Sequence, residues 1–214
     1  MVASIRYDAD AVQARLAASN RFLVQQVFRP LGNEYRISIP AAGSREEGEA
    51  LLFVKQKKLA IKEDIRFRLS PDDDAHLFMI KARAVFEFAG RNDVTDAAGN
   101  QLGVLGKDFM KSLLRSHWVV KDADDNVLFE AHEASWPIAV VRRIGGFLPN
   151  EFGLFGLLPF NFTLVRDGQE VGTYKRVLGK LRDRYVLELG PGLESADRRI
   201  VLAFAVALDA LQDR

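Results

Sequence analysis

The sequence contains no cysteine among its 214 residues, so disulfide bonds and thiolate metal sites are excluded. It also has almost no excess of charge: 30 basic and 29 acidic residues give a formal net charge of +1, which removes the global electrostatic argument for nucleic acid binding. No apolar run reaches the roughly 18 residues of a spanning helix. The first residues, MVASIRYDADAVQARL, lack the basic, apolar and small-residue order of a signal peptide. We therefore expect a cytoplasmic protein.

Motifs of catalysis and nucleotide binding are missing as well. The sequence has no G-x-S-x-G, no G-x-x-x-x-G-K-[ST] and no G-x-G-x-x-G. The three histidines, His76, His117 and His132, do not have a ligand spacing such as H-E-x-x-H, so we predict no metal site and no cofactor. The sequence therefore predicts a protein that is not an enzyme.

The most informative stretch that is present is IVLAFAVAL, residues 200–208, which has no polar side chain. A helix that is apolar on all sides has to be buried on all sides. This one is too short to cross a bilayer, which takes about 20 apolar residues. Because the rest of the chain is typical of strands, we predict a mainly β fold, a closed antiparallel barrel around this buried C-terminal helix.

The chain before this helix shows two periodicities. Val12 and Leu16 lie at helical spacing and predict a short N-terminal helix, and from Arg21 onward the apolar period is two. An alternating strand, an acidic turn and a second strand recur at residues 94–105, 118–131 and 162–174, with a degenerate copy at 69–81. This repeat predicts consecutive antiparallel hairpins. We also predict a turn at Gly32–Asn33, a short helix over Lys107–Arg115, a helical extension at 1–19 and a single domain at 20–214.

Three stretches carry a family resemblance: FVKQKKLAIKEDIRF at 53–67, the D-x-x-G and D-x-D-D-N hairpins, and RDRYVLELGPGLESADRRIVLAFAVALDAL at 182–211. Together they are similar to the tubby C-terminal-like superfamily, in particular its LURP-one-related branch and, more distantly, the phospholipid scramblases. The resemblance implies a barrel of about twelve strands around a hydrophobic C-terminal helix. It also implies phosphoinositide binding through basic side chains on the barrel, as in tubby proteins. LURP-one-related proteins have no settled biochemical role, and the chain lacks the palmitoylated cysteines, Pro-rich arm and spanning segment of scramblases.

Several basic residues are candidates for contact with anionic headgroups. Lys55 and Lys57 point to one face of a strand, and Lys175 points to one face of its own, so a shared basic surface is geometrically possible. Phosphate recognition needs such convergent charge-assisted donors. The alternative is a solvated barrel face whose charge is neutralised by nearby acidic residues. The candidate headgroup residues are Lys55, Lys57, Lys58, Arg142, Arg143, Lys175 and Arg176.

An apolar segment rich in glycine and proline, residues 144–160, leaves two functions open. Its candidate membrane or partner contacts are Phe147, Leu148, Phe152, Leu154 and Phe155. The leading function is a barrel that binds anionic phospholipid peripherally at the inner membrane surface, and in it the segment would dip into a membrane interface. For the segment itself burial is favoured, because apolar segments belong to the core far more often than they contact lipid. In the alternative the segment packs over the barrel mouth or forms a protein interface, in a scaffold or a homo-oligomer.

Acidic residues at two places in the sequence bear on a possible site or on the fold. Asp122, Asp124, Asn126 and Glu133 occupy positions one, three, five and twelve of an EF-hand-like loop. Val127, however, stands where that loop needs glycine, and the flanks have period two, so we predict a solvated hairpin turn. Asp209, on the apolar helix, has to reach solvent or a hydrogen-bond partner.

Overall fold

The computed structural model describes residues 8–29, 32–41, 44, 47–56, 64–72, 74–82, 90–107, 117–134, 161–177 and 184–210. Its elements in chain order are α1 (Ala9–Ala18), β1 (Arg21–Arg29), β2 (Gly32–Ser38), β3 (Ala50–Gln56), β4 (Asp64–Arg68), β5 (Phe78–Ala82), β6 (Arg91–Asp96), β7 (Gln101–Lys107), β8 (His117–Asp122), β9 (Val127–Glu133), β10 (Phe162–Arg166), β11 (Gln169–Arg176), β12 (Arg184–Leu189) and α3 (Arg198–Ala210).

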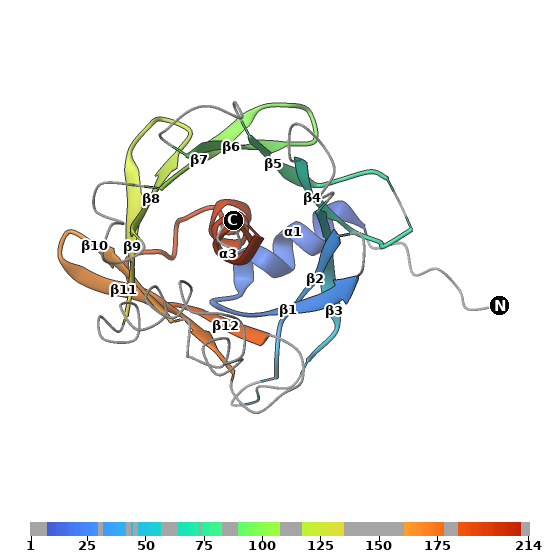
Figure 1. Ribbon diagram of the computed structural model, residues 1–214, viewed down its shortest axis with the longest axis horizontal. Helices are drawn as coiled ribbons and strands as arrows, with labels where there is room; N and C mark the ends of the chain where they lie inside the picture. Colours follow the sequence, from blue (N-terminus) through green and yellow to red (C-terminus); the bar gives the residue numbers. More distant parts are fainter. Residues whose placement is uncertain are drawn as a thin grey trace, which may run out of the picture.

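The strands form one closed antiparallel barrel. Each strand pairs with its neighbour in sequence, and β1 pairs with β12 to complete the circle. Figure 1 looks along the barrel and shows α3 in its centre, with α1 beside it. The structure thus confirms the predicted barrel, with the twelve strands that the family resemblance implied. Neither described helix has the length and apolar character that crossing a membrane would need.

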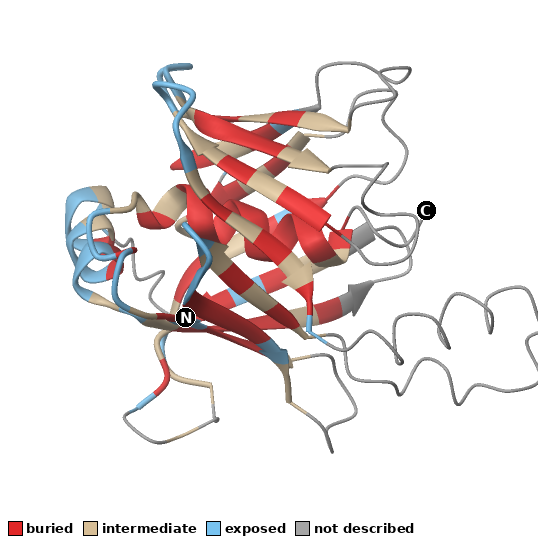
Figure 2. Ribbon diagram, turned by 90° about the vertical axis from the view of Figure 1, so that its left-hand side faces the viewer, coloured by how far each residue is buried: buried red, intermediate tan, exposed pale blue. Residues whose placement is uncertain are grey.

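The apolar helix α3 packs against the inward-facing apolar side chains of the strands. Every residue from Ile200 to Leu208 is buried, and Phe204 packs edge-on against Trp118 of β8 and Phe129 of β9, with ring centroids 6.3 and 5.2 Å apart. A barrel of about eight strands is filled by its own side chains, so twelve strands enclose more space, which a helix about 10 Å wide can occupy. Figure 2 shows the buried residues along the barrel wall and over α3.

Glycine allows the closest approach between helix and wall. Gly103 of β7 is buried, and a Cβ at this position would meet the carbonyl oxygen of Lys121. The Cδ1 atom of Ile200 would lie 3.0 Å from the same Cβ. A larger residue here would therefore disturb both the β7–β8 pairing and the packing of α3 against β7.

The two ends of the barrel differ in which connections they carry. The turn end holds α1, the connections β2–β3, β4–β5, β6–β7, β8–β9 and β10–β11, and residues 190–197, which lead from β12 into α3. The far end receives the last residues of α3. In Figure 2 the exposed residues gather at α1 and at the hairpin turns of the turn end.

The hairpins predicted from the repeat are confirmed as the pairs β6–β7, β8–β9 and β10–β11, and β4–β5 is the degenerate copy. The N-terminal helix is also confirmed, with Val12 and Leu16 buried. The turn predicted at Gly32–Asn33 is wrong, because these residues belong to β2 and pair with Arg29 and Phe28 of β1. The pairing extends the ladder past the Gly-Asn dipeptide and so overrides its turn preference. The predicted helix over Lys107–Arg115 lies, except for Lys107 in β7, outside the described residues.

Candidate functional site

Four basic side chains gather on the outer wall of three adjacent strands. They are Arg36 of β2, Lys55 of β3, and Arg66 and Arg68 of β4, and we call this group the basic face. Their neighbours in sequence, such as Tyr35, Val54 and Phe67, point into the core, so the period of two turns the four cations outward. The register sets Lys55 opposite Arg66, and it sets Arg36 and Arg68 on either side of Phe53.

A pocket of about 280 Å³ opens on this face. Its cationic lining consists of Arg36, Lys55 and Arg68, and it also contains the apolar groups of Val27, Phe53 and Pro71 and the carboxylates of Glu34 and Asp72. Arg68 is only 6% exposed, so its guanidinium forms part of the pocket wall, whereas Lys55 is exposed. The pocket is large enough for a phosphate ester.

The arginines of the basic face hold their acidic partners loosely. The nitrogen-to-oxygen distances are 3.9 Å from Arg36 to Glu47, 3.8 Å from Arg66 to Asp64 and 3.3 Å from Arg68 to Asp74, whose side chain is 94% exposed. Among the described residues, Lys55 forms no ion pair. The pairs of Arg36 and Arg66 are partly exposed, and surface pairs of this kind are worth at most about 1 kcal/mol, so an anion of higher charge can displace their carboxylates.

The pKa of His76 depends on the charged side chains of the basic face near it. Its pKa is lowered from the ordinary value, first by burial and then by the positive charges of Arg66 and Arg68. The carboxylate of Asp64 acts in the opposite direction but has the smallest effect of the four. At His76 the two arginines therefore outweigh Asp64.

The other predicted headgroup residues do not join the basic face within the described structure. Lys175 of β11 is exposed, but β12, β1 and β2 lie between β11 and β3. Four strand spacings amount to roughly 19 Å along the barrel wall, so Lys55 and Lys175 cannot hold the same phosphate group. Arg176 lies next to Lys175 on β11, half-buried, and its backbone N–H donates to the side chain of Asn161 at 3.0 Å.

Several predicted contacts lie outside the described residues. These are the basic residues Lys57, Lys58, Arg142 and Arg143 and the apolar residues Phe147, Leu148, Phe152, Leu154 and Phe155. The choice between a membrane contact and a protein interface for residues 144–160 therefore stays a prediction.

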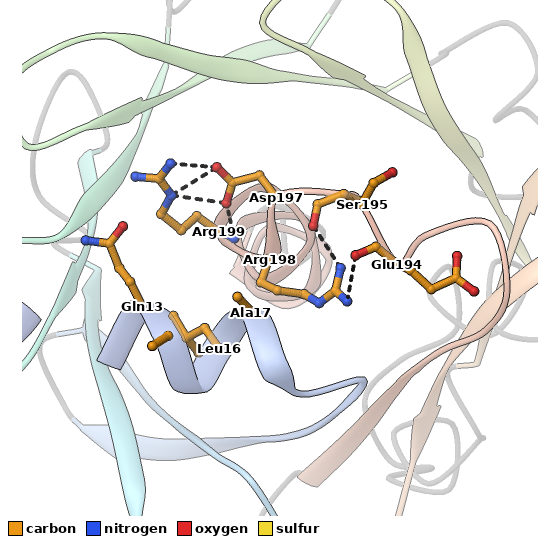
Figure 3. Close-up of a pocket in the computed structure, with 10 residues that line it drawn as sticks. Gln13, Leu16, Ala17, Glu194, Ser195, Asp197, Arg198 and Arg199 are labelled. Atoms are coloured by element: carbon orange, nitrogen blue, oxygen red, sulfur yellow. Dashed lines mark hydrogen bonds and ion pairs between the residues drawn. The ribbon is translucent and has the colours of Figure 1, made fainter. Parts of the chain in front are cut away.

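A larger pocket, of about 490 Å³, lies at the turn end between α1 and the start of α3. Figure 3 shows that its two arginines face partners of the chain itself. The guanidinium of Arg198 makes five hydrogen bonds of 2.6 to 3.3 Å, to the backbone oxygens of Ser19, Leu193, Glu194 and Ala196 and the side chain of Asn20. Burial lowers the pKa of Arg198 from its ordinary value.

The second arginine of this pocket, Arg199, forms an ion pair with Asp197. Its nitrogens lie 2.6 to 3.1 Å from the two carboxylate oxygens, and these hydrogen bonds raise the pKa of Arg199. A ligand anion would have to break well-aligned, partly buried hydrogen bonds, each worth about 1.5 to 3 kcal/mol when one partner is charged. We therefore assign this pocket a structural role, which is to lock the entrance of α3 to the turn end.

The acidic residues with EF-hand spacing form a hairpin turn, as predicted. The Oδ1 atom of Asp122 accepts hydrogen bonds from the backbone N–H groups of Asp124 and Asn126, and its Oδ2 atom accepts one from the Asn126 side chain. Glu133 stands at the other end of β9, roughly 20 Å away at about 3.4 Å per residue. It therefore cannot complete a calcium loop with Asp122.

A second polar cluster lies on the outer wall of β8 and β9. The register sets His117 directly opposite His132, and their ring centroids are 4.7 Å apart. The Nε2 atoms of His117 and His132 lie 2.9 and 3.8 Å from Oε2 of Glu130. Spacing along the sequence missed this group because its members come from two strands. The signal that could have found it is E-x-H in β9 combined with the register of the hairpin.

The comparisons with known proteins agree with the fold. A family model described as LURP-one-related matches residues 50–209. This span begins at the first residue of β3 and includes the ten strands from β3 to β12 and all but the last residue of α3. The comparison with curated proteins gave no match. On the family match, the chain belongs to the LURP-one-related family, a branch of the tubby C-terminal-like superfamily.

Proposed function

We propose that this protein is a non-catalytic barrel that binds anionic phospholipid headgroups at the surface of a membrane, through the basic face on β2, β3 and β4. Barrels of this family are generally non-enzymatic. The observation that carries the proposal is the pocket lined by Arg36, Lys55 and Arg68. It offers convergent cationic donors to one phosphate, which is the arrangement that charge-assisted recognition requires.

The contrast between the two pockets supports this choice. At the turn end the guanidinium groups of Arg198 and Arg199 are held by short hydrogen bonds to the chain itself. On the basic face the ion pairs are longer, and the carboxylate side chains of Glu47, Asp64 and Asp74 are 25%, 36% and 94% exposed. A phosphate can therefore replace carboxylates on the basic face at little cost, whereas at the turn end it would break the structure.

The proposal extends to Lys175 and Arg176 as a separate contact. Because a membrane presents many headgroups side by side, cations too far apart for one phosphate can meet different lipids of the same surface. Each basic residue near an anionic leaflet adds about 1 kcal/mol to association, and this gain is screened by salt. In a cell we expect peripheral binding at the inner membrane surface.

The test is co-sedimentation of the full chain with vesicles of phosphatidylcholine alone, with added phosphatidylserine, and with added phosphoinositide. The key variant is Lys55→Glu, because Lys55 is exposed and lies on the pocket rim. We expect binding only to the anionic vesicles, a loss of roughly tenfold in Lys55→Glu, and weaker binding at high salt.

Lys121→Glu is the matched control. It changes the net charge by the same amount, but Lys121 lies on β8, across the barrel from the basic face. Lys175→Glu, measured in parallel, reports on the separate contact. The proposal fails if the wild-type chain does not sediment with anionic vesicles, or if Lys55→Glu and Lys121→Glu lose binding equally. The first result would favour the alternative of a protein-interaction scaffold.

A further inference from the structure

We propose that His117, Glu130 and His132 form a binding site for a divalent transition metal ion, with Zn²⁺ as the preferred occupant. The site lies on the outer wall of β8 and β9, across the barrel from the basic face. It differs from the sequence prediction of no metal site, which considered only spacing along the chain.

The geometry of the two strands preorganises the ligands. Glu130 and His132 are two residues apart on β9 and point to the same face, and His117 is the direct cross-strand partner of His132. Trp118 and Ala131 are buried in the core, so the three polar side chains point away from α3. Strand positions hold side chains more firmly than loops do, which reduces the cost of assembling a site.

The distances suit a small ion with short bonds. One ligand atom from each residue lies within 4.8 Å of the other two, and the shortest separation is 2.9 Å. Bonds of about 2.0 to 2.2 Å to Zn²⁺ place tetrahedral ligand atoms roughly 3.3 to 3.5 Å apart. The observed separations lie on both sides of this value, so modest side-chain rotations without backbone movement bring the three atoms around one ion.

The chemistry of the donors favours a transition metal ion over Ca²⁺ and Mg²⁺. Two imidazoles and one carboxylate suit Zn²⁺ and similar transition metals, whereas Ca²⁺ and Mg²⁺ prefer shells made of oxygen. The side chain of His117 is 3% exposed, whereas those of His132 and Glu130 are 36% and 40% exposed. One ligand is therefore fixed in the wall and two face solvent, which leaves a way in for the ion and a fourth position for water.

The experiment uses the untagged full chain after treatment with a chelator. Zn²⁺ is titrated by calorimetry, and Co²⁺ is added to a second sample because its visible absorption reports the coordination geometry. The test variants are His132→Ala and Glu130→Gln, at half-exposed positions where the fold tolerates change, and circular dichroism checks that they remain folded. His76→Ala is the matched control, because His76 lies between β4 and β5, with β6 and β7 separating it from β8, and its charged neighbours are Arg66, Arg68 and Asp64.

We expect one Zn²⁺ per chain, bound at micromolar concentration or tighter, and no binding of Mg²⁺ at the same concentration. Each test variant should weaken Zn²⁺ binding by at least about tenfold and alter the Co²⁺ spectrum, and His76→Ala should change neither. Three outcomes would overturn the proposal: no Zn²⁺ binding by the wild-type chain, equal binding by the folded test variants, or a loss of binding in His76→Ala. The three side chains would then only form hydrogen bonds between β8 and β9 and bind no metal.

Discussion

The hydroxyl group of Tyr35 donates a hydrogen bond to Oδ2 of Asp209 at 2.8 Å and so joins β2 to the last turn of α3. Tyr185 of β12 donates to Oδ1 of the same carboxylate at 3.2 Å. The acidic residue on the apolar helix thus has the hydrogen-bond partners that its position demanded. The two tyrosines fix the far end of α3 to the wall, and at the turn end Arg198 ties the start of α3 to Ser19 and Asn20.

Removing the hydroxyl group of Tyr35 should destabilise the protein. Tyr35→Phe keeps the ring, which is 1% exposed, and removes a hydrogen bond to a charged group. We expect a loss of about 1.5 to 3 kcal/mol in the free energy of unfolding, measured by urea denaturation. A double-mutant cycle with Asp209→Ala isolates the pair, and a coupling energy near zero would show that the bond does not hold the helix.

Phe204 should be among the most sensitive positions in the chain. It is fully buried between Trp118 and Phe129, so Phe204→Ala leaves a cavity and should cost about 3 to 5 kcal/mol. Phe204→Asp would bury an unpaired charge and should unfold the chain, as should removal of residues 197–214. Circular dichroism and tryptophan fluorescence measure both effects, with the exposed change Asp124→Ala as control. Cooperative unfolding of the Phe204→Asp variant near the wild-type temperature would contradict the central role of α3.

Gly99 offers a clean measurement of backbone strain. Its φ is +88°, and no atom lies within 4 Å of the position that a Cβ would occupy. Gly99→Ala should therefore cost about 1 to 2 kcal/mol in unfolding free energy, from backbone conformation alone. Gly99→Asn should cost less, because asparagine tolerates this conformation. Equal losses for the two variants would point to a cause other than φ.

Asp96 should add stability that disappears in acid. The side chain and backbone N–H of Asn100 donate to its carboxylate and lower its pKa from the ordinary value. Because the unfolded chain binds the proton more tightly, this stability is present above the unfolded pKa of about 3.9 and is lost as pH falls through the folded pKa. Thermal unfolding of the wild type and Asp96→Asn from pH 6 to pH 2 measures the effect. The two curves should converge at low pH, and a constant separation would contradict the assignment.

Local patterns predicted a closed barrel around a buried helix, whereas the number of strands followed only from the family resemblance. The apolar run at Ile200–Leu208 and the two-residue period of the strands each predict burial without knowledge of distant residues. The two Asp turns have the same hydrogen-bond pattern. Asn100 donates to the carboxylate of Asp96 as Asn126 donates to that of Asp122, in each case from its backbone N–H and its side chain.

Each candidate site combines residues from adjacent strands, and the sequence does not show which residues of two strands lie side by side. Lys55 was predicted as a headgroup contact, but its companions Arg36 and Arg68 come from adjacent strands and are found only through the register. The same holds for His117 and His132, which become neighbours only when the β8–β9 hairpin closes. Lys175 was grouped with Lys55 because both are basic, but in the barrel three strands, β12, β1 and β2, lie between them.

The order of elements along the chain bears on how the barrel folds. β1 finds its second neighbour, β12, only after all the other strands have been synthesised, and α3 follows β12. Until then the inward faces of the early strands have no core to cover, and the ladder between Arg21 and Glu188 cannot form. Contacts so distant in sequence slow folding, and the intermediates expose apolar surface and unpaired strand edges. The growing chain is therefore most vulnerable to aggregation just before α3 leaves the ribosome, and a chaperone that shields the open sheet would help it most at that stage.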